Sequence, residues 1–520
     1  MKPVPFRRIK CPLSSAVFVP LALVALILAV PARAQERELF KITPTAFADM
    51  PPQQQGVLTK LREAKGLEVL KVVQIDGALL GGENVTLDLA PGLKLKSTKG
   101  KVERTDATNF IWSTGLTGKE SHALFVVHGK NVTATISTEK GVYQVRPLGD
   151  GMHAIVKIDY AKMPDEHPPS FKEIEKKTPP PPAPRDVLSD TGAKADAVAT
   201  FRVLVAYTPA VNAAVADIQG LIDIAIQETN QGFANSLVNA KAVLAHTHQV
   251  NYVESGSFDT DLANFRNNGD GSMDEIHDLR KKYCADVLVL LINDTAYCGL
   301  ASAIMADAGT AFVVVYHNCA TGYYSFAHEI GHLAGCRHNP QADPTTTPFS
   351  YGHGYQHGPE FRTIMAYADG CTPPCPRINY WSNPSVSYNG IPTGTAVTND
   401  NHRVWNTTAS TVAGFVSDIA CLRIDWGKFK YLVALCKYVG CGILLHGEQY
   451  INPAPEFLKA VEKGGPTAKK LQGAKEKAIG LVLQAERATP ATEKSIESQA
   501  RTLDKEVRTL VGTTKAPAPM

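Results

Sequence analysis

The chain has 520 residues, of which 44% are hydrophobic and 20% are charged, and its formal net charge is +3. This composition is typical of a folded globular protein with room for two or three domains, and it excludes a disordered chain. The near balance of charges gives no indication of a polyanionic partner, so we expect no nucleic-acid binding.

The amino terminus has the pattern of an export signal. Basic residues at positions 2, 7, 8 and 10 precede an apolar run from about Ala16 to Val30, and Ala32-Arg33-Ala34 has the small-x-small form of a signal-peptidase site. A membrane anchor is the competing interpretation, but the run is short and contains Pro20. We predict a signal peptide over residues 1–34, a secreted or periplasmic protein, and no stable membrane insertion after signal cleavage.

Residues 35–165 are predicted to form a β-rich domain, and no cysteine lies between residues 12 and 283. Six segments have strand patterns: Glu68–Leu80, Asn84–Leu89, Ala123–His128, Val132–Ser137, Val142–Val145 and Ala154–Ile158. Residues 166–199 are predicted to be a linker. Pro, Lys and Glu dominate from Pro164 to Pro184, with four prolines at 179–182, which favours an extended, exposed spacer that proteases cut easily.

Residues 200–420 alternate between strand and helix patterns, which predicts an α+β domain. The strands are expected at Phe201–Tyr207, Lys241–Tyr252, Asp286–Ile292 and Ala311–His317. The helices are expected at Met273–Lys282 and along the stripe of Ile218, Leu221, Ile222, Ala225 and Ile226.

The stretch from His328 to His338 has the spacing of a zinc site. His328 and His332 are four residues apart, so both imidazoles project from one face of a helix. Gly335 allows a positive φ, so the chain can turn and bring His338 to the same ion. Glu329 is beside the first ligand without being one, as a general base requires, and a water would take the fourth position.

This motif resembles that of the metzincin metallopeptidases, which carry a tight turn with a methionine beneath the metal. Thr363-Ile364-Met365-Ala366-Tyr367 lies 27 residues after His338 and matches that Met-turn. The resemblance implies a mixed twisted sheet over a zinc-binding helix, with Met365 as a packing residue. It also implies that Tyr367 ligates zinc at rest and hydrogen-bonds the oxyanion, although a core tyrosine would be compatible with the same position.

The run from Asp286 to Gly394 also resembles the bacterial peptidyl-Asp metalloendopeptidases, through Trp381-Ser382-Asn383-Pro384 and the segment Tyr388–Gly394. This second resemblance implies a secreted zinc endopeptidase that acts on protein or peptide substrates with an acidic residue after the cut bond. The metal motif alone favours a zinc endopeptidase and does not give the acidic preference.

Two groups of substrate-binding residues are expected. In metzincins, the strand ahead of the zinc helix is an exposed sheet edge to which a peptide adds as an antiparallel strand. Gly299, Leu300, Ala301 and Ser302 are the candidates, although a plain surface hairpin would have the same sequence. The metzincin resemblance implies that the pocket after the cut bond is built by the segment that follows the Met-turn, and an acidic side chain there needs a cation. Arg377 and then Arg403 are the candidates, although an exposed surface arginine would be compatible with the same sequence.

The β-rich domain is most simply a pro-domain that acts as an intramolecular inhibitor, whereas an attached binding domain is the alternative. It has no cysteine to place on zinc, so inhibition would need a carboxylate, a histidine or steric cover. Nine cysteines remain after export, so disulfides are expected with at least one thiol left over, and Cys371 with Cys375 is better explained as a disulfide than as a zinc knuckle. We expect structural roles for four other histidines: His317, His353, His357 and His402.

Residues 421–520 are predicted to be a helical extension in which Ile496, Ala500, Leu503, Val507 and Leu510 form one face. A bundle packed on the protease, a secretion element and a segment removed on maturation are all compatible with it. For the whole protein, the alternative function is an inactive metal-binding adhesion protein on the same scaffold. Glu329 argues against it, because such a protein needs no base.

Overall fold

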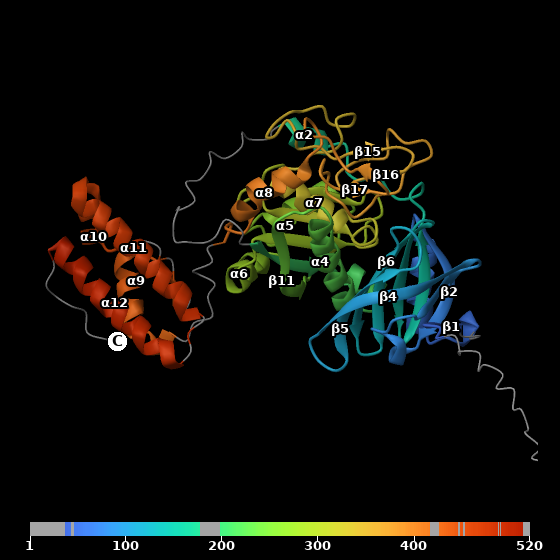
Figure 1. Cartoon of the computed structure of the whole chain (residues 1–520), viewed down its shortest axis with the longest axis horizontal. Coiled ribbons are helices and arrows are strands. Elements are labelled where there is room, and N and C mark those ends of the chain that lie inside the picture. The colour runs from blue at the N-terminus through green and yellow to red at the C-terminus, as the bar shows by residue number, and fades with distance from the viewer. Residues whose placement is uncertain are drawn as a thin grey trace, which may run out of the picture.

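The protein is described by a computed structural model that covers residues 37–42, 46–176, 198–416, 426–441, 443–445, 448–450, 453–486, 488 and 490–512. Figure 1 shows two units side by side, an amino-terminal sheet and a mixed domain, together with a helical bundle near the carboxyl terminus. The predicted signal peptide and the four prolines at 179–182 lie outside the described residues.

The amino-terminal unit is a nine-stranded antiparallel sheet in the order β1-β2-β9-β8-β7-β6-β5-β4-β3. Its strands are β1 (Phe40–Ile42), β2 (Leu67–Ile75), β3 (Thr86–Ala90), β4 (Leu93–Arg104), β5 (Asn109–Leu116), β6 (His122–His128), β7 (Asn131–Thr138), β8 (Gly141–Gly149) and β9 (Met152–Ile158). From β3 to β9, each strand pairs with the next one along the chain. Sheet pairing is therefore mostly local in sequence.

This unit differs from the predicted one in several elements. Helix α1 (Pro52–Glu63) and strands β1, β4 and β5 were not predicted. The predicted strand Glu68–Leu80 is too long, because β2 ends at Ile75 and a short 3-10 turn follows from Gly77 to Leu79. The side chain of Asp76 accepts a hydrogen bond from the amide of Ala78, which starts that turn.

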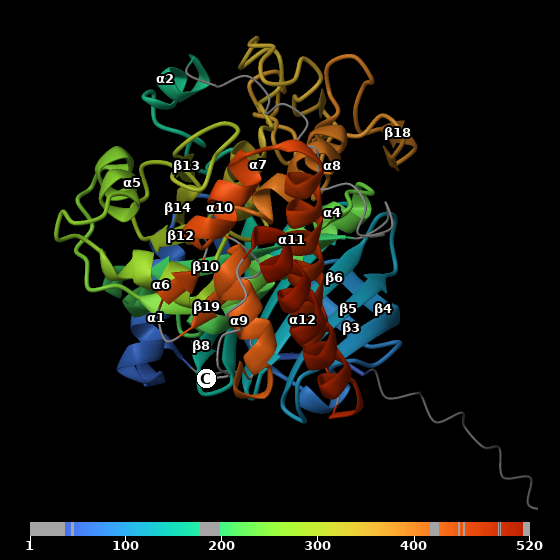
Figure 2. The ribbon, with the colours of Figure 1, turned by 90° about the vertical axis from the view of Figure 1, so that its left-hand side faces the viewer.

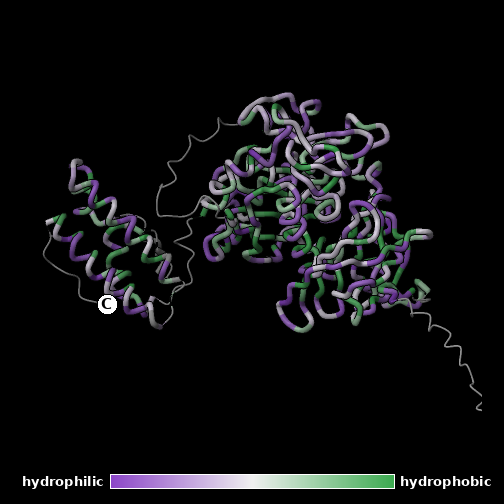
Figure 3. The backbone as a smooth tube through the Cα atoms, viewed as in Figure 1, coloured by the Kyte–Doolittle hydropathy of each residue, from purple (hydrophilic) through white to green (hydrophobic). Residues whose placement is uncertain are grey.

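The mixed domain has a five-stranded sheet in the order β11-β10-β12-β14-β13. Its strands are β10 (Ala199–Tyr207), β11 (Ala240–Gln249), β12 (Val287–Ile292), β13 (Gly299–Ala301) and β14 (Phe312–Tyr316), and only β13 runs antiparallel to its neighbour. All side chains of β12 and β14 are buried, as their continuous apolar sequences require. Figure 3 shows hydrophobic residues gathered in the interior of the mixed domain. The strand ahead of the histidine helix, β14, is therefore interior, and β13 forms the sheet edge.

The helices of this domain are α3 (Pro209–Ala214), α4 (Ile218–Asn235), α5 (Phe258–Arg266), α6 (Glu275–Tyr283), α7 (Ser325–Ala334) and α8 (Asn401–Val412). The predicted apolar stripe lies on α4, which packs against α7, and α8 also packs on α7. Four short strands, β15 (Gln356–His357), β16 (Phe361–Arg362), β17 (Ser387–Tyr388) and β18 (Ile391–Pro392), form two hairpins in the long segment between α7 and α8.

Helix α7 carries the histidine motif and ends where the sequence predicts. Gly335 has a φ of 103°, which lets the chain leave the helix towards His338. Residues 363–367 turn tightly beneath α7, with the amide of Ala366 donating to the carbonyl of Thr363 at 3.0 Å. A Cβ on Gly331 would come 2.7 Å from the sulfur of Met365, so the absence of a side chain there allows the close approach of helix and turn.

The two units share a buried contact in which α4 packs against β6 and β7. Gln144 on β8 donates to the carbonyl of Thr321 at 2.7 Å, and Arg146 donates to the Thr321 hydroxyl at 3.3 Å. Thr321 belongs to the loop that leads into α7. The amino-terminal sheet thus holds the segment from which the histidine helix starts.

The carboxyl-terminal bundle consists of α9 (Lys430–Val439), α10 (Pro455–Glu462), α11 (Gly465–Glu486) and α12 (Pro490–Val511), which lie side by side in Figures 1 and 2. A short hairpin of β19 (Ile443–Leu445) and β20 (Glu448–Tyr450) follows α9. Four residues of the predicted α12 face are buried in the bundle core and Leu510 packs against it. Among the described residues, no helix combines the length and the hydropathy that crossing a membrane requires.

Described disulfides join Cys298 to Cys319, Cys371 to Cys375 and Cys436 to Cys441. The pairing of Cys371 with Cys375 agrees with the disulfide interpretation of these residues. Cys336, at the end of α7, is a buried free thiol.

Candidate active site

Three imidazoles converge at the end of α7. The Nε2 atoms of His328 and His332 are 3.1 Å apart, and those of His328 and His338 are 3.3 Å apart. His328 Nδ1 donates to the carbonyl of Ile364 at 2.8 Å, and His332 Nδ1 donates to the carbonyl of Cys336 at 2.9 Å. Because a carbonyl can only accept, the protons of these two rings are on Nδ1, and their Nε2 lone pairs face each other.

This arrangement fits a metal ion. His338 Nδ1 lies 3.2 Å from a carboxylate oxygen of Glu175, so its Nε2 lone pair also points inward. Burial lowers the pKa of all three imidazoles well below the usual range, which keeps the rings neutral. Converging lone pairs on neutral rings repel unless a cation lies among them, and imidazole nitrogen is a preferred zinc ligand.

A fourth histidine, which the sequence did not single out, belongs to the same group. One ring nitrogen of His167 lies within 4.8 Å of a ring nitrogen of each of the other three, and all four side chains are buried. His167 Nε2 is 2.9 Å from Glu329 Oε1, and His167 Nδ1 is 2.6 Å from the Tyr367 hydroxyl. His167 thus contacts both residues that were predicted to act in catalysis.

Glu329 lies on α7 beside the histidines and is fully buried. Burial raises the pKa of its carboxyl group to about 7, against the opposing effect of nearby His167. Its carboxylate packs so closely on Gly299 of β13 that a Cβ there would lie 2.6 Å from the Glu329 Cδ atom. The sheet edge therefore fixes where this carboxylate can lie.

Tyr367 is half-buried, with its ring centroid 4.1 Å from that of His338. Burial raises the pKa of its phenol well above the usual value, and the nearby carboxylates of Glu166 and Glu329 add to the effect. The phenol therefore keeps its proton and can donate a hydrogen bond.

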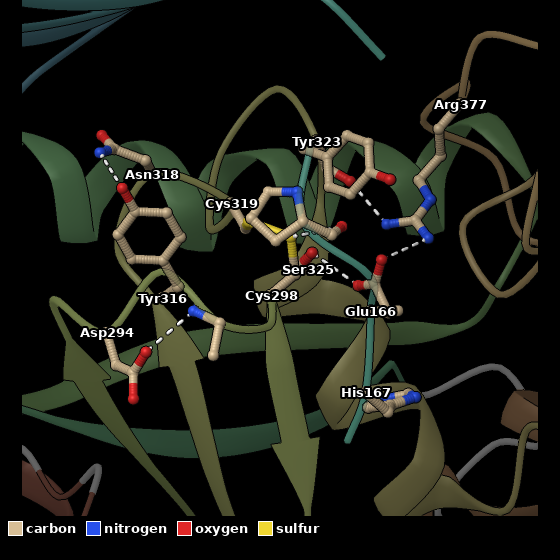
Figure 4. Close-up of a disulfide and its surroundings, with 12 residues drawn as sticks. Glu166, His167, Asp294, Cys298, Tyr316, Asn318, Cys319, Tyr323, Ser325 and Arg377 are labelled. Carbon is tan, nitrogen blue, oxygen red and sulfur yellow. Dashed lines mark hydrogen bonds and ion pairs between the residues drawn. A yellow bond between two sulfur atoms is a disulfide. The ribbon is translucent and has the colours of Figure 1, made fainter. Parts of the chain in front are cut away.

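Arg377 is buried in the site and is not an exposed surface residue. Figure 4 shows its guanidinium directed at Glu166, whose carboxylate it reaches at 2.8 Å. The guanidinium also donates to the carbonyl of Tyr323 at 2.9 Å and lies 4.5 Å from the centroid of that ring. Burial alone would raise the pKa of Glu166, but the charge of Arg377 outweighs it and holds this pKa below its usual value.

The structure corrects two expectations about this region. Residues 164–176 are not an exposed spacer: Glu166 and His167 are buried, and helix α2 (Phe171–Lys176) follows them with Phe171 buried. Contacts with the mixed domain thus override the Pro- and Lys-rich composition. The edge strand Gly299–Ala301 is likewise buried: Glu166 accepts a hydrogen bond from the Gly299 amide, α5 and α7 pack against the strand, and Ser302 is half-buried at its end.

Other predicted residues lie outside this group. Arg403 is exposed on α8, with its guanidinium 4.0 Å from the centroid of the Tyr351 ring. His353 Nδ1 lies 2.7 Å from the carbonyl of His338, and His317 Nε2 lies 2.8 Å from Asn293. These hydrogen bonds agree with structural roles for the two histidines.

Comparisons with known proteins agree with this geometry. A model of the metallo-peptidase family M12 matches residues 198–382. A peptidyl-Asp metalloendopeptidase of Xanthomonas campestris pv. campestris is 41% identical over 424 residues, which cover 77% of this chain and 99% of that protein. A protein of the same name from Stenotrophomonas maltophilia is 40% identical over 75% of this chain and 96% of its own length. Another from Pseudomonas fragi is 45% identical over 36% of this chain and 99% of its own length.

Metalloproteinase-II of Bacteroides fragilis, a solved structure, aligns with a TM-score of 0.30 and 14% identity over 55% of this chain and 85% of its own. That similarity is too low to bear on the fold.

Proposed function

Because this chain belongs to the peptidyl-Asp metalloendopeptidase family and is a zinc metalloendopeptidase, we propose that His328, His332 and His338 hold its zinc and that Glu329 is its general base. The observation that carries the proposal is the convergence of three imidazole Nε2 atoms, 3.1 and 3.3 Å apart, beside a buried carboxylate that binds none of them. Protein or peptide chains are its substrates.

When bound, zinc supplies a Lewis acid that polarises the scissile carbonyl and acidifies a water molecule. Glu329 takes a proton from that water and passes it to the leaving amine. Tyr367 keeps its phenolic proton and donates a hydrogen bond to the oxyanion. Gly299, Leu300, Ala301 and Ser302 hold the substrate backbone in extended form along β13.

Arg377 gives the enzyme its preference for an acidic residue after the cut bond. Its guanidinium is buried next to the histidine group, follows residues 363–367 in sequence and already binds one carboxylate, that of Glu166. A planar guanidinium suits a carboxylate because it can donate two hydrogen bonds to it, worth roughly 1.5–3 kcal/mol for charged partners. Arg403, exposed on α8, is the weaker candidate.

The chain organisation that we propose is a signal peptide (1–34), a pro-domain (35–165), a processing region (166–199), a peptidase domain (200–420) and a helical extension (421–520). Residues 363–367 are the Met-turn, with Met365 packed beneath α7. The protein is exported, and its precursor is latent until it is cut between about Pro179 and Ala199.

The test is digestion of casein with and without a chelator, with product termini read by mass spectrometry. We expect chelation to abolish cleavage and new amino termini to begin with Asp or Glu. Glu329→Gln should keep the metal and lose activity by at least about 100-fold, because general bases contribute roughly 10²–10⁴-fold. Glu275→Gln, an exposed position on α6, is the matched control. Loss of metal from the Glu329 variant, or retention of its rate, would contradict the assignment.

A further inference from the structure

Residues 165 and 166 hydrogen-bond to the sheet edge at the start of β13, and Asp165 forms an isolated β-bridge there. The carbonyl of Asp165 accepts from the amide of Cys298, and that of Glu166 accepts from the amide of Gly299, both at 2.9 Å. The bridge between Asp165 and Tyr297 is parallel. A substrate is expected to add to this edge in the antiparallel direction. The segment therefore lies where a substrate would bind, but its chain runs in the opposite direction.

The reversed direction gives Glu166 a defined place. His167 lies at the histidine group, and Glu166 precedes it in the chain. Because the segment runs in the opposite direction to a substrate, Glu166 lies on the side where a substrate has the residue after its cut bond. Glu166 is in this position, and its carboxylate is bound by Arg377 at 2.8 Å and by the Ser325 hydroxyl at 2.6 Å, as Figure 4 shows. The side chain therefore fills the pocket that we assign to an acidic substrate residue.

His167 then faces the three converging imidazoles with a ring nitrogen. The ring is held on its other face by Phe171, whose centroid is 4.0 Å away with the two planes 17° apart. Further along α2, Lys172 donates to the carbonyl of Ala342, and Glu175 contacts His338. One short segment thus contacts the histidine group, the base and the acidic pocket together.

We propose that Glu166-His167 is a built-in blocking dipeptide, in which His167 supplies a fourth ligand to the active-site metal and Glu166 occupies the pocket of Arg377. This inference rests on the proposed function and gives the chemical basis of the precursor's latency. The segment is not itself cut, because an imidazole instead of a peptide carbonyl is presented to the metal. When the metal is bound, the ligating ring nitrogen gives up its hydrogen bond to Glu329 or to Tyr367.

The first experiment measures how firmly the intact precursor holds its metal. Each variant carries Glu329→Gln so that the chain stays uncut, and zinc transfer to an excess of a chromophoric chelator is followed with time. We expect His167→Ala and His167→Gln to release zinc at least about tenfold faster than the parent. His122→Ala on β6, outside the histidine group, is the matched control and should release zinc at the parent rate.

The second readout is the visible spectrum of the same proteins loaded with Co²⁺, which reports the ligand set directly. Loss of His167 should shift the bands, whereas Glu166→Gln should leave them nearly unchanged, because His167 stays in place. His167→Gln keeps a polar side chain of similar reach, so it remains informative if His167→Ala folds poorly.

Unchanged zinc release and unchanged Co²⁺ spectra in both His167 variants would overturn the inference. The casein digest, run on the catalytically intact chain after its linker is cut, separates this failure from failure of the proposed function. If the cut parent digests casein while the His167 variants match the parent in both metal readouts, only the blocking dipeptide is wrong. If the cut parent does not digest casein, the proposed function is wrong.

Discussion

Gly299→Ala should impair catalysis without removing the metal, because the three heavy atoms nearest to the added Cβ all belong to Glu329. The Cβ would lie 2.6 Å from Glu329 Cδ and 2.7 Å from Cγ, and closer still to Oε1. The Cγ atom is not a free end that can swing aside, so the whole carboxylate arm must move. The histidine nitrogens are not among these contacts.

The size of the effect follows from these distances. Carbon atoms pack at about 3.5 Å, so Cδ must retreat by about 0.9 Å, and a misplacement of about 1 Å in a catalytic group costs on the order of 100-fold in rate. Overpacking of this kind also costs about 1–3 kcal/mol of folding stability, which lowers Tm by roughly 2–12 °C in a domain of this size. We therefore expect kcat to fall about 100-fold while the zinc content stays at one per chain.

The assay is cleavage of a peptide containing Asp by the processed enzyme, together with zinc content and thermal unfolding. Gly309→Ala is the matched control, because its Cβ would find its nearest neighbour, Asp307 Oδ1, at 3.4 Å. A Gly299→Ala enzyme with the parent kcat would refute the claim that β13 fixes the position of Glu329. Loss of zinc would refute the claim that Gly299→Ala displaces Glu329 without disturbing the three histidine ligands.

Three further predictions concern specificity, pH and packing. Arg377→Ala should reduce the preference for Asp over Asn after the cut bond by at least about tenfold on paired peptides, a change of about 1.4 kcal/mol, whereas Arg403→Ala should not; a uniform loss on both peptides would contradict the pocket. Hydrogen bonds to Asp217, the N-cap of α4, and to Asp223 within that helix raise the pKa of His128 to about 9. Its contribution to precursor stability should therefore be complete below about pH 6.5 and lost as pH rises through 9. In the uncut Glu329→Gln chain, adding His128→Gln should lower Tm, and this decrease in Tm should become smaller towards pH 10. A decrease that becomes larger with pH would contradict the prediction. Gly331→Ala places a Cβ 2.7 Å from two buried side chains and should destabilise the protein by about 1–3 kcal/mol in thermal unfolding; an unchanged Tm would show that helix and turn can separate freely.

The histidine group could be predicted from sequence because its geometry is local. His328, Glu329 and His332 are set by one helical turn, and Gly335 needs only its own positive φ to redirect the chain. The pattern of α4 is similarly local, since its apolar stripe repeats with the helical period. Such features need no knowledge of which distant segments meet.

Features that depend on distant contacts could not be predicted in this way. Strand β4 is rich in lysine and mostly exposed, so its sequence lacks the apolar alternation that marks a half-buried strand. His167 follows Pro164 in a segment whose composition indicates a spacer, yet it contacts Glu329, 162 residues away. The only sequence signal was a histidine beside an acidic pair at the end of a domain without cysteine, and that signal does not say where the segment docks.

The contact of Gln144 and Arg146 with Thr321 has a consequence for the order in which the chain folds. The amino-terminal sheet is built from neighbouring strands and is synthesised first, whereas the parallel sheet must join residues as far apart as Val203 and Val287 before its pairing stabilises it. Folding slows as such long loops are closed. A preformed β8 that holds the loop ahead of α7 offers a template for this slower step, and an enzyme that has lost its amino-terminal sheet must refold without that template.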